Sequence, residues 1–101
     1  MITILTYGNE SVHNLIEYFV KDKAQVIQVQ EYDKKQKCDL FIVTGVQSEE
    51  ILLASDLIVD ELMFKLYPEI EVNLIIGKLR TKVNIGQYTN EQIRNIWREL
   101  P

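Results

Sequence analysis

The segment from Asp39 to Thr44 constrains the fold most, because it is apolar on both alternating faces: Asp-Leu-Phe-Ile-Val-Thr. A strand with one face in water alternates apolar with polar residues, whereas a strand covered on both faces reads as a nearly continuous apolar run. Such runs are typical of parallel sheets that lie under helices. We therefore predict that residues 39–44 form a central strand, which Gly45 ends.

Two strands and one helix are predicted before this segment. Residues 2–7 and 24–30 are short and rich in β-branched and apolar side chains, which is typical of strands. The Gln-rich alternation of 24–30 indicates a wetter face, and hence a place near a sheet edge. Between these strands we predict a helix from Glu10, with Asn9 as its N-cap. Its apolar stripe follows the spacing i, i+3, i+4, i+7, i+8: Val12, Leu15, Ile16, Phe19 and Val20.

The second half of the chain predicts helices and strands in alternation. Ser48 is a suitable N-cap for a long apolar helix, and Pro68 is expected to end that helix. Thr89 and Gln92 have the spacing of a capping box, so they indicate the start of a last helix. The elements predicted after Gly45 are a helix over 48–66, strands over 70–76 and 83–85, and a helix after Thr89.

These elements give the order β-α-β-β-α-β-β-α for a single α/β domain over residues 1–101. Helices that alternate with buried strands favour a mostly parallel sheet in a flavodoxin-like or related layered architecture. A doubly wound sheet would place the 39–44 strand beside the first strand. The link over 31–38 lacks a clear helix. It fits either a crossover, which we favour, or an antiparallel hairpin.

Composition excludes several classes of protein. The single Cys38 rules out an internal disulfide, and we expect it to pack as a small apolar residue. No apolar run reaches the roughly 18 residues of a membrane span, and the N-terminal residues lack the pattern of a secretory signal. We therefore expect a cytoplasmic protein without a membrane partner.

The net charge of −4 is unevenly distributed. Residues 1–75 hold six Lys against thirteen Asp or Glu, a net charge of −7, whereas residues 76–101 carry +3. An acidic chain is a poor binder of nucleic acid, because contacts to phosphate dominate that affinity. The basic last quarter, with Lys78, Arg80 and Lys82, leaves a small anion or an acidic partner open.

The loops after the first and third predicted strands form one candidate ligand site. In open α/β sheets, ligands bind beyond the carboxyl ends of the strands, where the winding reverses. Both loops contain a glycine and hydroxyl groups, and both lead into helix N-termini, whose free N–H groups favour an anion. The candidate phosphate-binding residues are Thr6, Gly8, Asn9, Ser11, Thr44 and Ser48.

Two resemblances bear on this site. Residues 7–11, Tyr-Gly-Asn-Glu-Ser, resemble the flavodoxin phosphate loop Thr-Gly-Asn-Thr-Glu in Gly8 and Asn9, which implies a flavin mononucleotide phosphate there; Glu10 departs from the pattern. The layout also resembles the IIB components of the bacterial sugar phosphotransferase system. Their commonest forms carry a phosphorylated Cys directly after the first strand, where this chain has Thr6 and Tyr7. We expect no cofactor.

The predicted helix over 48–66 is more apolar than one buried face requires. One broad side, including Ile58, Leu62 and Leu66, is interpreted as the core face. A second cluster, here called the predicted seam, consists of Leu53, Leu57 and Phe64, and Asp60 lies in the neighbouring acidic stripe. Exposed large apolar side chains invite association, so a neighbouring element or a second protein covers them. A symmetric dimer through this helix is the simplest version.

No set of residues indicates catalysis or metal binding. His13 is the only histidine, and its neighbour Glu17 is a common surface pair at i+4. No nucleophile, base and orienting group can be assembled, and no carboxylate cluster has ligand spacing. The leading hypothesis is a non-enzymatic regulatory or assembly domain that acts through protein–protein interaction, including with itself. The alternative is a small-ligand domain that holds a phosphate-bearing molecule of nucleotide or flavin type.

Overall fold

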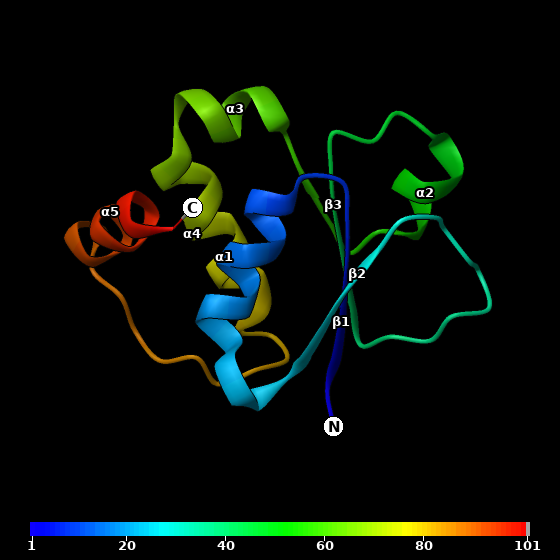
Figure 1. Cartoon of the computed structure of the whole chain (residues 1–101), viewed down its shortest axis with the longest axis horizontal. Coiled ribbons are helices and arrows are strands. Elements are labelled where there is room, and N and C mark those ends of the chain that lie inside the picture. The colour runs from blue at the N-terminus through cyan, green and yellow to red at the C-terminus, as the bar shows by residue number, and fades with distance from the viewer. Residues whose placement is uncertain (101) are drawn as a thin grey trace.

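A parallel sheet lies at the centre of the computed structural model, which describes residues 1–100 (Figure 1). Its strands are β1 (Thr3–Tyr7), β2 (Gln25–Val29), β3 (Leu40–Thr44) and β4 (Leu57–Val59), in the spatial order β2-β1-β3-β4. All five residues of β3 are buried, and β3 pairs with β1. The predictions of a central strand over 39–44 and an edge strand over 24–30 are therefore confirmed.

Five α-helices accompany the four strands within the described residues. They are α1 (Glu10–Val20), α2 (Glu49–Ala54), α3 (Glu61–Leu66), α4 (Pro68–Leu79) and α5 (Asn90–Glu99); a short 3₁₀ turn, η1 (Lys21–Lys23), follows α1. Asn9 caps α1 as predicted, since its Oδ1 accepts from the Ser11 N–H at 2.8 Å. Thr89 and Gln92 form the predicted capping box of α5.

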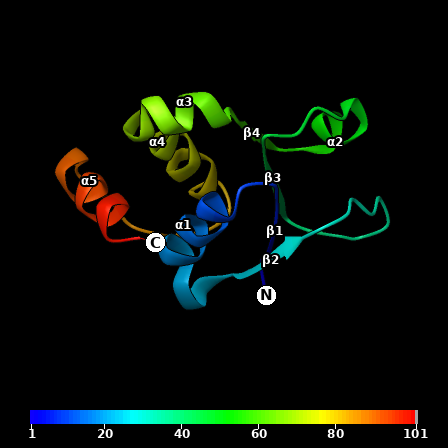
Figure 2. The same ribbon diagram turned by 45° about the horizontal axis from the view of Figure 1, so that its top comes forward.

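The helices cover the two faces of the sheet unequally (Figures 1 and 2). On one side, α1 and α4 pack on the sheet, with α3 and α5 outside them, and the larger part of the core lies there, with Ile4 and Ile42 from the sheet. The opposite face has a smaller buried cluster: Leu5, Phe41, Val43 and, from α2, Ile51. The chain is thus a compact α/β domain with a well-covered and a thinly covered sheet face.

The connection between β2 and β3 explains the thin covering. Both strands pair in parallel with β1, through Thr3↔Gln25 and Ile4↔Leu40, and not with each other. Residues 30–39 therefore cross the sheet without a helix, on the face opposite α1. The predicted crossover is confirmed, and the alternative of a hairpin is wrong.

The predicted helix over 48–66 is wrong, because the segment forms α2, β4 and α3. Asp56 interrupts it by binding the neighbouring strand twice. Its Oδ2 accepts from the Phe41 N–H at 2.7 Å, and its own N–H donates to the Phe41 carbonyl at 2.7 Å. The Ser55 hydroxyl donates to the Leu52 carbonyl and ends α2. Asp and Ser side chains compete in this way with helix backbone bonds.

The predicted strands over 70–76 and 83–85 are also wrong, so the order β-α-β-β-α-β-β-α does not hold. Pro68 starts α4 instead of only ending the previous helix, because its fixed φ suits the first helical turn. Residues 70–74 alternate in polarity like a strand, but the buried apolar residues of α4 follow helical spacing: Val72, Ile75, Ile76 and Leu79. Val83 and Ile85 are buried without joining the sheet.

None of the helices in residues 1–100 combines the length and apolar character that crossing a bilayer requires.

Candidate functional site

The loops after β1 and β3, predicted to hold a ligand, do lie against each other. Gly8 has φ +106°, and a Cβ at this position would stand 1.9 Å from the carbonyl oxygen of Thr44. Only glycine allows this conformation and this approach. Gly8 is therefore required by the packing of the two loops, independently of any ligand.

The space between these loops is occupied by an acidic side chain. Glu61, the first residue of α3, accepts a hydrogen bond at Oε1 from Asn9 Nδ2 at 3.3 Å. Its Oε2 lies 2.8 Å from the place where a Cβ of Gly45 would be. Ser48 stands at the N-cap of α2 without a side-chain capping bond. The carboxylate of Glu61 makes the entrance unfavourable for an anion such as a phosphate.

Thr6 points away from this entrance, into the core. Its hydroxyl Oγ1 lies 2.6 Å from His13 Nδ1, and His13 Nε2 lies 2.5 Å from Glu17 Oε1. An ionised carboxylate only accepts, so the ring donates to Glu17 through Nε2–H, while Nδ1 shares a hydrogen bond with the Thr6 hydroxyl. The order of the hydrogen-bonded groups, hydroxyl to imidazole to carboxylate, is the same as in the catalytic triad of hydrolases. Thr6 is only 3% exposed, however, so this chain of bonds fixes α1 to β1 and offers no room to a substrate.

The predicted seam does not form one surface. Phe64 is 2% exposed and packs edge to face on Trp97, whereas Leu53 is 80% exposed on α2. Leu57 is half-buried in β4. Asp60 caps α3, with its Oδ1 accepting from the Met63 N–H at 3.0 Å. The seam fails because β4 interrupts the helix whose periodicity defined it.

A different apolar surface, here called the apolar row, is present on β4, α3 and α4. Its six large apolar side chains are each between 52% and 64% exposed, and three of them had been predicted to be core. They are Ile58, Leu62, Leu66, Tyr67, Ile70 and Leu74. The signal that would have found the row is the i, i+4 spacing of Leu62 with Leu66 and of Ile70 with Leu74.

Glu71 is a buried carboxyl behind this surface, on the inner side of α4. Burial raises the pKa of the Glu71 carboxyl, and the negative charge of Asp60 raises it further. The backbone N–H of Asp60 acts in the opposite direction. The side chain is thus held more protonated than an ordinary glutamate.

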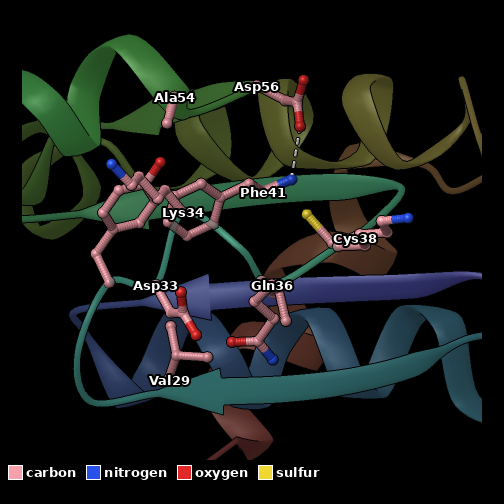
Figure 3. A pocket seen from close by; sticks show the side chains of 11 residues that line it. Val29, Asp33, Lys34, Gln36, Cys38, Phe41, Ala54 and Asp56 are labelled. Carbon is pink, nitrogen blue, oxygen red and sulfur yellow. Dashed lines mark hydrogen bonds between the residues drawn. The ribbon is translucent and has the colours of Figure 1, made fainter.

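A cavity of about 420 Å³ lies on the thinly covered face, against the crossing segment 30–39 (Figure 3). Val29 and Phe41 from the strands form one side, and the crossing segment, including Cys38, forms the other. Tyr32 stacks on Phe41 with ring centroids 5.9 Å apart. The charged lining residues are two of each sign, so they favour neither an anion nor a cation: Asp33, Lys34, Lys37 and Asp56.

Cys38 is exposed, so the prediction that it packs as a small apolar residue is wrong. Desolvation raises the pKa of its thiol, and the carboxylates of Asp56 and Asp39 raise it further. The neutral thiol is therefore favoured, which lowers its reactivity as a nucleophile.

No group of three or more His, Cys, Asp or Glu side chains within residues 1–100 is arranged to hold a metal ion. Comparison of the chain with protein-family models, with curated proteins and with solved structures finds no match.

Proposed function

We propose that the protein is a non-enzymatic assembly domain, and that a second copy of the same chain docks on the apolar row. The observation that carries this proposal is the concentration of six large, half-exposed apolar side chains on three consecutive elements. Burying one such side chain contributes about 1.5–3 kcal/mol relative to leaving it in water. An exposed row of this kind is typical of protein–protein interaction sites.

The continuity of the row supports a single docking surface. Ile58 and Leu62 line one shallow hollow, and Leu66 and Ile70 line a second. Leu62 and Leu66 are four residues apart on α3, so they lie on the same side of that helix and connect the two hollows.

The charges beside the row favour a second copy as the partner. Glu61 and Lys65 are an exposed pair on α3, with Lys65 Nζ 4.0 Å from Glu61 Oε1. When two α3 helices pack antiparallel around a two-fold axis, Lys65 of each copy faces Glu61 of the other. Such self-complementarity is what an isologous interface requires.

The strand order also supports a flavodoxin-like relationship, because 2-1-3-4 is the beginning of the flavodoxin-like order 2-1-3-4-5. The alternative function, a phosphate-bearing ligand at the loops after β1 and β3, has less support. The carboxylate of Glu61 lies between these loops, where it would repel a phosphate.

A native mass spectrum of the purified protein, with light scattering across a concentration series, tests this proposal. The expected species has twice the chain mass of 11.8 kDa. The double variant Leu62→Glu/Leu66→Glu should remain folded by circular dichroism and should be monomeric at low micromolar concentration, where the wild type is a dimer. Leu53→Glu is the matched control, because it places the same charge on an exposed leucine outside the row; it should keep the dimer. A monomeric wild type, or a double variant that still dimerises at low micromolar concentration, would overturn the proposal.

A further inference from the structure

Leu53 is a prominent exposed side chain that the apolar row does not include. It lies on α2 and is 80% exposed, more than any other large apolar side chain after Met1 within the described residues. Glu49 and Glu50 precede it by four and three residues, so they lie on the same side of α2 and are also exposed. The short helix α2 therefore presents one leucine flanked by two carboxylates.

A small pocket with the complementary character lies between α4 and α5. Its apolar lining is contributed by Val72, Ile93 and Trp97. Arg94 and Arg98 stand at its rim. Arg94 is bonded to the carboxylate of Glu69, whereas Arg98 forms no ion pair within residues 1–100. The pocket is therefore apolar inside, with one available positive charge at its edge.

The size of this pocket limits the kind of group that fits into it. Its volume is about 190 Å³. Sites for whole small molecules measure roughly 300–1,000 Å³, so this pocket is too small for most of them. It is suited to a single anchoring side chain of another protein, as in the central pockets of protein interfaces.

The leucine and the pocket lie at opposite ends of the molecule. In both views of the ribbon, α5 and α2 occupy the two ends (Figures 1 and 2), and the longest dimension is 38 Å. Leu53 of one copy therefore reaches a pocket only on another copy.

We propose that Leu53 of one copy enters the α4–α5 pocket of a second copy, with Glu49 and Glu50 facing Arg98. The two surfaces are different, so the contact is heterologous and leaves a free leucine at one end and a free pocket at the other. Heterologous contacts that do not close into a ring build open linear assemblies. This contact is separate from the apolar row and does not depend on the proposed function.

The test uses the double variant Leu62→Glu/Leu66→Glu as its background, so that pairing through the apolar row is absent. Sedimentation velocity should show monomers of this background at low micromolar concentration, and masses that grow as the concentration is raised to millimolar. Adding Leu53→Glu, or Arg98→Glu, should reduce each protein to monomers. Asn95→Glu is the control on α5, because Asn95 is not part of the pocket lining, and it should leave the growth unchanged.

Mixing the two blocked proteins gives the most specific result. The Leu53→Glu protein retains an intact pocket, and the Arg98→Glu protein retains an intact leucine, so the mixture should form a one-to-one complex and stop there. A mixture that remains monomeric, or a background variant that is monomeric at every concentration, would overturn the head-to-tail contact. Either result leaves a dimer of the wild type through the apolar row unaffected, so the two proposals fail separately.

Discussion

The ring of Phe64 meets the ring of Trp97 edge to face, with centroids 4.6 Å apart and planes at 88°. This contact joins α3 to α5 and fixes which side of α3 faces inward. Leu62 and Leu66, on the same short helix, are directed into solvent. The structure therefore separates neighbouring apolar residues of α3 into one core residue and two surface residues.

Substitution of Phe64 by Ala should cost about 3–5 kcal/mol of unfolding free energy, because it removes a buried aromatic ring and leaves a cavity. In the monomeric state, Leu62→Ala and Leu66→Ala should each change stability by no more than about 0.5 kcal/mol. Urea unfolding at a concentration where the protein is monomeric measures all three. Equal losses at the three positions would contradict the orientation of α3.

Gly8→Ala should destabilise the fold more than Gly86→Ala. Both glycines have positive φ, for which a side chain costs about 1–2 kcal/mol. At Gly8 the added Cβ also collides with the Thr44 backbone, whereas at Gly86 no atom of residues 1–100 other than its chain neighbours lies within 4 Å of the added Cβ. Thermal unfolding of the two variants makes the comparison, and a smaller loss at Gly8 would show that the two loops are not in contact.

Thr6→Val should cost about 1–3 kcal/mol, because it leaves Nδ1 of the buried His13 without its partner. Thr3→Val serves as the control, since the Thr3 side chain makes no hydrogen bond within residues 1–100 and the β1 strand is otherwise unchanged. Chemical denaturation provides both values. The double variant Thr6→Val/His13→Phe should recover part of the loss, because both polar partners are then removed together.

Glu71→Gln should stabilise the protein at neutral pH and leave it unchanged in acid. The raised pKa of Glu71 in the folded state means that its stabilising contribution is complete below the ordinary glutamate pKa and is lost as the pH rises through the folded value. The neutral amide avoids this loss. Unfolding curves of the variant and the wild type from acidic to neutral pH test the sign of this effect. A difference in unfolding free energy that widens in acid would contradict it.

Asp60→Asn is the companion variant for this measurement. It removes the negative charge that adds to the effect of burial on the pKa of Glu71, while the Asn side chain still caps α3. The stability gap between Glu71→Gln and its parent should therefore be smaller in the Asp60→Asn background.

Cys38 should react with iodoacetamide more slowly at mildly alkaline pH than an ordinary thiol such as glutathione. Its raised pKa leaves less thiolate, which is the reacting form. Asp56→Asn should accelerate the reaction, because it removes a neighbouring negative charge and retains an acceptor for the Phe41 N–H. Mass spectrometry of the alkylated protein with time gives the rates; an unchanged rate in the variant would exclude the charge effect.

Local patterns predicted the first half of the fold well and failed between residues 48 and 79. The apolar run of β3 and the apolar stripe of α1 each fit a single periodicity, and both elements form where that periodicity predicts them. Residues 51–66 are apolar at so many positions that a helical pattern fits them by default. The break depends on the bonds between Asp56 and Phe41, fifteen residues apart in the chain, which no local pattern contains.

The same reason limited what could be said of the candidate sites. The meeting of the loops after β1 and β3 was predictable, because it follows from strand order. The place of Glu61 between them was not, because it depends on where α3 begins. The presence of uncovered apolar side chains in this part of the chain was predicted, but their identity required the position of β4.

The unequal covering of the sheet has a consequence for how the protein opens. Segments with few buried contacts exchange their amide protons through local openings that cost less than global unfolding. The crossing segment 30–39 contains no helix, and Ile51 is the one buried residue of α2. Residues 30–56, apart from β3, should therefore lose exchange protection first, while β1, β3 and α1 remain protected until the whole domain unfolds. The thinly covered face would then be exposed transiently in a molecule that is otherwise folded.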